Sequence, residues 1–252
     1  MSQPHLVQGG FPPEGEIFDV PSFRLRVLDG LHPWTDGRAA QIERNWRRET
    51  AANPHLFNGT MVFQRRLSFD AGHIEGEAHM VPYAAFLHWR RSGRGEGGHH
   101  LFAMPLILSA DGALMAIRMA GTTANPGRVY PPAGSLDAGD VRGGLCDLVG
   151  NMRRETMEET GLDLGGMAAD PAFRAVHAEN TVALFRVYRS PLSEAALGAQ
   201  VEAHIAAEAQ PEIAALIGIR SADPEAHDYP AFMPPVLDWL LEKGWIFEKG
   251  TT

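Results

Sequence analysis

The segment Arg153–Leu162 reads RRETMEETGL and holds three glutamates within five positions. Each residue of a helix advances by about 100°, which places Glu158 about 60° to one side of Glu155 and Glu159 about 40° to the other. The three carboxylates would therefore share one helix face. Like charges this close repel one another unless a cation lies among them.

A divalent metal ion is the cation that this pattern favours. Hard oxygen ligands suit Mg²⁺, with Mn²⁺ as the alternative. Arg154 can hold a ligand carboxylate in place. We predict a helix over residues 147–160, which Asp147 caps and Gly161 ends. The competing interpretation is a solvated helix face, on which clustered glutamates are common.

The spacing of these residues resembles the Nudix box. The second half of that box is Arg-Glu, two residues, Glu-Glu, one residue and Gly before an apolar residue, and residues 154–162 match every charged position. Gly134, followed after five residues by Asp140, resembles the first half. There are three departures. Asp140 stands where the family has Glu, thirteen residues instead of seven precede Arg154, and Thr156 occupies an apolar position.

The resemblance implies a fold as well as a site. We expect an α/β protein with a Nudix-type α/β/α sandwich and mixed sheet over residues 96–252. An N-terminal α+β extension over residues 1–95 would precede it and build substrate specificity or a homodimer interface. The glycine-rich stretch 92–100 is the expected linker. Asp111-Gly112 between two apolar runs predicts a hairpin.

An activity follows from the same resemblance. Nudix enzymes hydrolyse a nucleoside diphosphate linked to another group, by attack of water on phosphorus. The resemblance implies a Mg²⁺-dependent pyrophosphohydrolase acting on a small-molecule nucleoside diphosphate derivative. Glu155, Glu158 and Glu159 would be the metal ligands, and Arg154 would orient them.

Other charged residues are weaker candidates. Arg118 and Arg128 flank the loop that leads into the box, and each is a phosphate contact or a surface arginine. Glu179 and Glu212 each precede a predicted strand and are candidates for the general base. The adjacent pair at 99–100, both His, should point to opposite faces of a strand, which argues against a shared metal.

Three other functions stay open. The protein could hydrolyse a non-nucleotide diphosphate or a CoA ester. It could be a Nudix-fold sensor that binds a nucleotide without cleaving it, although a sensor needs no full set of glutamates. The acidic helix could also belong to an unrelated α/β protein, which would bind Mg²⁺ no better than an ordinary surface does.

The composition of the whole chain indicates which partners and which cellular compartment to expect. The chain has 252 residues and a formal charge of −9, which argues against a nucleic-acid partner. Cys146 is the sole cysteine, so no internal disulfide can form and a reducing compartment is expected. We see no secretion signal and no apolar run of about 18 residues, so we expect a cytoplasmic protein with no membrane span.

Overall fold

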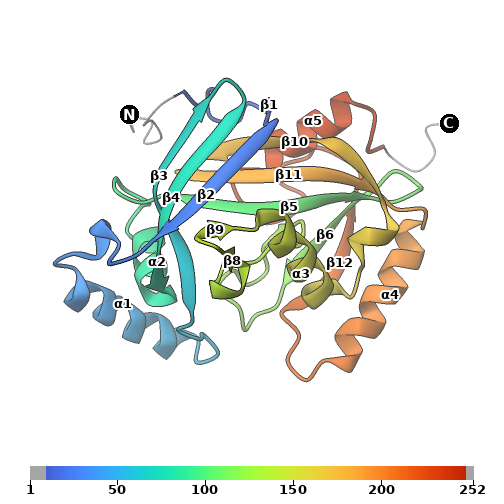
Figure 1. The fold of residues 1–252 in the computed structure, drawn as a ribbon. Coiled ribbons are helices and arrows are strands. Elements are labelled where there is room, and N and C mark those ends of the chain that lie inside the picture. Colours follow the sequence, from blue (N-terminus) through green and yellow to red (C-terminus); the bar gives the residue numbers. More distant parts are fainter. Residues whose placement is uncertain (1–9, 248–252) are drawn as a thin grey trace.

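The computed structural model describes residues 10–247 and shows a larger and a smaller β-sheet with five α-helices around them (Figure 1). The strands of the larger sheet are β1 (Phe18–Asp19), β5 (His100–Leu108), β6 (Leu114–Met119), β7 (Val129–Tyr130), β10 (Ala168–Ala178), β11 (Thr181–Arg189) and β12 (Ile213–Ile219). Their spatial order is β1-β10-β11-β5-β6-β12, with β7 beside β6. β11 and β5 are parallel while the other neighbours are antiparallel, so the sheet is mixed.

The smaller sheet has five strands in the order β3-β4-β2-β9-β8 and is also mixed, because β2 and β4 run parallel. These strands are β2 (Ser22–Leu28), β3 (Thr60–Asp70), β4 (His73–Pro82), β8 (Val141–Arg142) and β9 (Leu145–Cys146). The smaller sheet therefore combines strands from the first hundred residues with strands from the loop inside the box.

The helices are α1 (Ala39–Ala52), α2 (Tyr83–Arg91), α3 (Leu148–Thr160), α4 (Glu194–Ala207) and α5 (Met233–Glu242). Three short 3₁₀ turns, η1 (Pro33–Thr35), η2 (Ala138–Asp140) and η3 (Leu164–Gly166), complete the elements. Within residues 10–247, every helix is too short or too polar to cross a bilayer.

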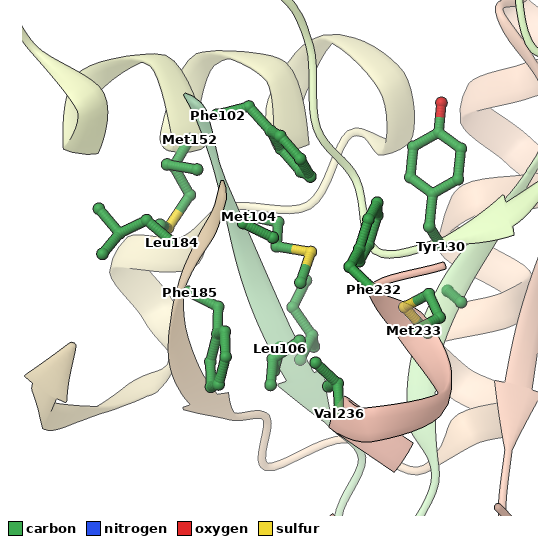
Figure 2. Packing of buried hydrophobic residues seen from close by; sticks show 14 of the residues in the cluster. Phe102, Met104, Leu106, Tyr130, Met152, Leu184, Phe185, Phe232, Met233 and Val236 are labelled. Atoms are coloured by element: carbon green, nitrogen blue, oxygen red, sulfur yellow. The ribbon is translucent and has the colours of Figure 1, made fainter. Parts of the chain in front are cut away.

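Helices cover the larger sheet on both faces. Leu184 and Phe185 are adjacent in β11, so their side chains point to opposite sides of the sheet. Leu184 lies beside Met152 of α3 (Figure 2), and both are fully buried. The Phe185 ring lies 5.6 Å, centroid to centroid, from Trp239 of α5. The mixed-sheet α/β/α architecture expected from the sequence is therefore confirmed.

The predicted hairpin between β5 and β6 is also present. The Ser109 N–H donates to the Ala113 carbonyl at 2.9 Å, and Gly112 adopts a φ of 82°. This turn joins β6 to β5, which lies inside the larger sheet and contacts α3 (Figure 1).

The long loop between the two halves of the box contains a second hairpin, which the sequence analysis did not predict. β8 and β9 turn through Gly143 and Gly144, whose φ angles of 58° and 75° are those a tight hairpin turn requires. Leu145 of β9 pairs with Arg26 of β2. The insertion thus joins the N-terminal strands to the segment that leads into α3.

Candidate active site

Helix α3 begins and ends where the sequence predicts. The Asp147 side chain accepts a hydrogen bond from the Gly150 N–H at 2.8 Å, which caps the N-terminus. Gly161 takes a left-handed φ of 69° and ends the helix. The glutamates at 155, 158 and 159 all line one large cavity of about 1870 Å³.

The cavity draws its walls from both halves of the chain. One part consists of α3, the segment from Ala133 through η2, and Glu212 just before β12, and we call it the acidic end. α2, the segment after it and the turn between β10 and β11 form another part. A site at the junction of several elements is the usual location of a ligand pocket.

Glu159 lies deepest at the acidic end. Its side chain is buried, and one carboxylate oxygen accepts a hydrogen bond from the Ala133 N–H at 3.0 Å. Burial raises the pKa of Glu159 well above its usual value, and the charges of Glu155 and Glu212 raise it further. Among residues 10–247 no cationic side chain pairs with Glu159, so an ionised Glu159 lacks a compensating positive charge there.

Glu155 lies one helical turn before Glu159, with its carboxylate packed against Gly134. Burial raises its pKa to about 7, although the neighbouring Arg154 acts to lower it. A Cβ placed on Gly134 would lie 2.0 Å from the Glu155 carboxylate, so only glycine leaves room for this side chain. The first glycine of the box is therefore needed for the position of the first glutamate.

Arg154 connects the acidic residues to one another. Its guanidinium donates to the buried carboxylate of Asp140 at 3.0 Å and lies 2.8 Å from Glu155 and 2.8 Å from Glu158. Asp140 also accepts from the Asp137 N–H at 2.9 Å, which fixes it in η2. Asp140 thus anchors Arg154, and Arg154 bridges two of the predicted metal ligands.

Asn151 belongs to the site, and the sequence analysis missed it. Its amide nitrogen donates to Asp140 at 3.0 Å and to Glu155 at 3.3 Å. Its amide oxygen is buried, with no hydrogen-bond partner among residues 10–247. The signal was present in the sequence, because Asn151 lies four residues before Glu155 and so on the same helix face.

The donor set fits a hard divalent cation by its chemistry. Glu155, Glu158, Glu159 and Glu212 offer only oxygen donors. Burial and like charges raise the pKa of Glu155 and Glu159, and a bound divalent cation would favour the ionised form of both side chains. Within the described part of the chain, no three His, Cys, Asp or Glu side chains already form a metal-binding cluster, and Arg154 bridges Glu155 and Glu158 instead.

The remaining predicted residues fall in different places. Glu212 lines the acidic end, and its charge raises the pKa of Glu155 and Glu159. Glu179 lines the cavity beside Arg94, with which it forms an ion pair. Arg128 lines the cavity, whereas Arg118 is exposed on β6 outside it.

The histidine pair at the start of β5 splits as expected. His99 is buried, and burial lowers its pKa to about 4. His100 instead lines the cavity, where its ring stacks on Phe102 at 5.1 Å between centroids. The two side chains share no ligand site.

Comparison with known proteins gives the following likenesses. No protein-family model and no curated protein matches the sequence. The MutT protein from Methanosarcina mazei Go1 is similar in structure, at 14% identity over 58% of this chain and 96% of that chain, with a TM-score of 0.36. A NUDIX hydrolase from Nitrosomonas europaea has 14% identity over 61% and 95%, with a TM-score of 0.35. The E. coli ORF135 protein has 12% identity over 61% and 96%, with a TM-score of 0.32. The protein from Nitrosomonas europaea carries the name of the Nudix family, whose box the sequence of α3 resembles.

Proposed function

We propose that this protein is a Mg²⁺-dependent hydrolase that cleaves a nucleoside diphosphate linked to another group. The observation that carries the proposal is the placement of Glu155, which is largely buried, and Glu159, which is buried; both belong to one helix, line a large cavity and have raised pKa values. Buried carboxylates without a cation are unfavourable in a structure. Their presence here is explained by a divalent ion with its anionic substrate.

The roles of the residues follow from their positions. Glu155, Glu158 and Glu159 would hold the metal ion, which when bound screens phosphate charge and lowers the pKa of water. Arg154, anchored on Asp140, orients Glu155 and Glu158. The Ala133 N–H fixes one oxygen of Glu159.

Glu212 is the general base that the geometry favours. It lines the acidic end, within electrostatic reach of Glu155 and Glu159, and partial burial together with the charge of Glu158 raises its pKa. A carboxylate with a raised pKa is better matched to accept a proton from water near neutral pH. Glu179 is the weaker candidate, because it is paired with Arg94 rather than placed among the acidic residues.

The test is product release from a panel of compounds, with Mg²⁺ and with EDTA. The panel contains nucleoside triphosphates, nucleotide sugars, ADP-ribose, dinucleoside polyphosphates and CoA. We expect metal-dependent cleavage of at least one compound between its phosphates. Tight nucleotide binding with no cleavage would instead support the sensor, and the absence of Mg²⁺ binding would overturn the proposal.

A further inference from the structure

We infer that the cavity has a second subsite, formed by Arg90, Arg94 and Arg128, that binds an anionic group of the substrate away from the diphosphate. This inference rests on the proposed function, because it names the class of nucleoside diphosphate derivative that the site takes. The class is a derivative that carries an additional phosphate or carboxylate. We call these three residues the arginine end.

The three arginines converge from distant parts of the chain. Arg90 belongs to α2, Arg94 follows it, and Arg128 lies just before β7, yet all three line the cavity. They are close enough that the charges of Arg90 and Arg128 act to lower the pKa of Arg94, which burial lowers most. Positive charges this close repel one another unless an anion lies between them.

Among residues 10–247, the carboxylates near these arginines are all largely exposed, including Glu14, which lines the cavity and accepts a hydrogen bond from the Glu179 N–H at 3.1 Å. Glu179 pairs with Arg94, but its side chain is 63% exposed. Asp228 lies 3.7 Å from Arg128 and is also 63% exposed. Arg90 has no carboxylate partner among residues 10–247. A substrate anion would therefore meet, at Arg90, a positive charge on the cavity wall that no carboxylate of residues 10–247 pairs with.

Arg90 is held in a fixed orientation by neutral acceptors. One terminal nitrogen donates to the Asn125 side-chain oxygen at 3.0 Å, and the other donates to the Ala124 carbonyl at 3.3 Å. Its guanidinium lies 5.9 Å from the centroid of the Phe86 ring. Neutral acceptors position a guanidinium without cancelling its charge, which leaves the charge available to a ligand.

The backbone around Arg94 is constrained as well. Arg94 adopts a left-handed φ of 51°, an uncommon conformation for a side-chain-bearing residue. Its N–H donates to the Trp89 carbonyl at 3.2 Å, and its carbonyl accepts from the Asn180 amide. The turn between β10 and β11 thereby fixes Arg94 toward the cavity, beside Glu179.

Tyr130 interacts with both ends. Its hydroxyl accepts a hydrogen bond from Asn125 at 3.3 Å, and Asn125 in turn accepts from Arg90. Burial raises the pKa of Tyr130 most, the charge of Glu159 raises it further, and the charge of Arg90 lowers it. Tyr130 is therefore within electrostatic reach of both ends, which lie at different places along one cavity.

The volume between the ends suits an extended ligand. Pockets for small ligands typically measure about 300–1,000 Å³, whereas this cavity measures about 1870 Å³. A row of rings lines it, with centroid distances of 4.9 Å from Phe86 to His100, 5.1 Å from His100 to Phe102 and 5.2 Å from Phe102 to Phe232. Figure 2 shows Phe102 and Phe232 together, with Tyr130 close by. A diphosphate alone would fill only part of this volume.

The first experiment measures binding of inorganic phosphate by calorimetry, in the presence of EDTA. Without metal the acidic end repels phosphate, so binding reports on the arginine end. A charge-assisted hydrogen bond contributes about 1.5–3 kcal/mol, so Arg90→Gln and Arg94→Gln should each weaken binding by about tenfold or more. Arg47→Gln is the matched control, because Arg47 lies on α1 with a 77% exposed side chain.

Removal of a negative charge beside Arg94 should have the opposite effect on phosphate binding. Glu179→Gln removes the carboxylate that competes for Arg94, so phosphate should bind more tightly. If Arg94→Gln does not fold, Arg90→Gln and Arg128→Gln carry the test in its place. Equal phosphate binding by the wild type and all arginine variants, or no phosphate binding by the wild type, would overturn the inference.

The second experiment compares substrates that differ in one anionic group. UDP-glucuronate against UDP-glucose tests a carboxylate, and NADPH against NADH tests a phosphate. We expect a lower KM for the anionic member of one pair, and we expect Arg90→Gln to raise the KM of that member to the KM of its uncharged partner. The pair that responds identifies the source of the anion, and a preference unchanged in Arg90→Gln would contradict the subsite.

The two proposals fail in different ways. Phosphate binding that depends on the arginines, in a protein that cleaves nothing, would overturn the hydrolase and keep the subsite. Metal-dependent cleavage with no effect of the arginine substitutions would keep the hydrolase and overturn the subsite.

Discussion

The acidic end and the arginine end of the cavity are built in different ways. At the acidic end, α3 alone provides three carboxylates within five residues. At the arginine end, the charges come from α2, the segment after it and the loop before β7, with the turn between β10 and β11 beside them. One end is a local motif, while the other exists only after the chain has folded.

The two ends also differ in the sign of their unbalanced charge. Burial raises the pKa of Glu155 to about 7, whereas burial and the charges of Arg90 and Arg94 lower the pKa of His100 to about 3. Each group is shifted toward its neutral form, mainly because burial disfavours a charge and also because like charges lie nearby. The cavity therefore suits a ligand assembly with a cation at one end and an anion at the other.

Loss of the acidic ligands should have the largest effect. We expect Glu159→Gln, and the Glu158→Gln/Glu159→Gln double variant, to lower kcat by roughly 10³-fold or more, because several kcal/mol of metal stabilisation are lost. Circular dichroism should show an intact fold, since Gln matches Glu in shape. Glu202→Gln, on an exposed part of α4, is the control. An unchanged rate in the double variant would refute the role of these glutamates.

Gly134→Ala should have the next largest effect. The added methyl group would lie 2.0 Å from the Glu155 carboxylate and must displace it. A displacement of about 1 Å in a catalytic group can cost about 10²-fold in rate. Steady-state kinetics should show this loss, while Gly121→Ala, where a methyl group meets nothing within 4 Å, should behave as wild type. Equal kinetics of the two variants would contradict the placement of Glu155.

Asp140→Asn should have a moderate effect on the acidic end alone. The variant removes the buried charge that anchors Arg154. Residues that orient metal ligands typically contribute about 10–100-fold to affinity or activity. We expect a loss of that size in Mg²⁺ affinity, measured by metal titration, and no change in metal-free phosphate binding. Asp163→Asn, at the N-cap of η3, is the control. A loss of phosphate binding would show that the two ends are not independent.

His100→Phe should have the smallest effect at neutral pH. The pKa of His100 is about 3 in the folded protein and about 6.5 in an unfolded chain. The unfolded chain therefore binds the proton first, so the stabilisation is complete above pH 6.5 and is lost as the pH falls toward 3. The wild type should lose about 1.4 kcal/mol more than the variant for each pH unit in that window.

Urea unfolding at pH 7, 5 and 4 measures this difference. His32 and His99, whose pKa values are also lowered to about 4, titrate in both proteins and cancel in the comparison. His55→Asn, at an exposed position, is the control. A parallel loss of stability in the wild type and His100→Phe would show that the arginine end does not disfavour a positive charge on His100.

The sequence predicted the acidic end because its determinants are local. Asp147 caps α3, Gly161 ends it, and the helical repeat places the glutamates on one face, all within fifteen residues. The hairpin at Asp111-Gly112 was predicted for the same reason, since two residues fix the turn. The metal itself and the catalytic roles remain predictions.

The turn of the β8–β9 hairpin has a recognisable sequence, whereas its pairing with β2 does not. Gly143-Gly144 is a typical hairpin turn and could have been recognised in the sequence. Its partner could not, because pairing of Leu145 with Arg26 joins positions far apart in the chain. Such a contact depends on the whole fold and leaves no periodic pattern.

The sequence by itself therefore determined the acidic helix, its caps and the mixed α/β class, because hydrogen bonds and side-chain periodicity act over a few residues. Three features depend on the tertiary structure alone. The Glu155 carboxylate packs against Gly134, and Glu212 lies at the acidic end of the cavity. Arg90, Arg94 and Arg128 line the same cavity. In sequence, nothing distinguishes Arg90 and Arg94 from surface residues, and Arg128 is either a phosphate contact or a surface arginine. Packing of α2 against the sheets brings these arginines to the wall of one cavity, where less water surrounds them and their charges act more strongly on a ligand.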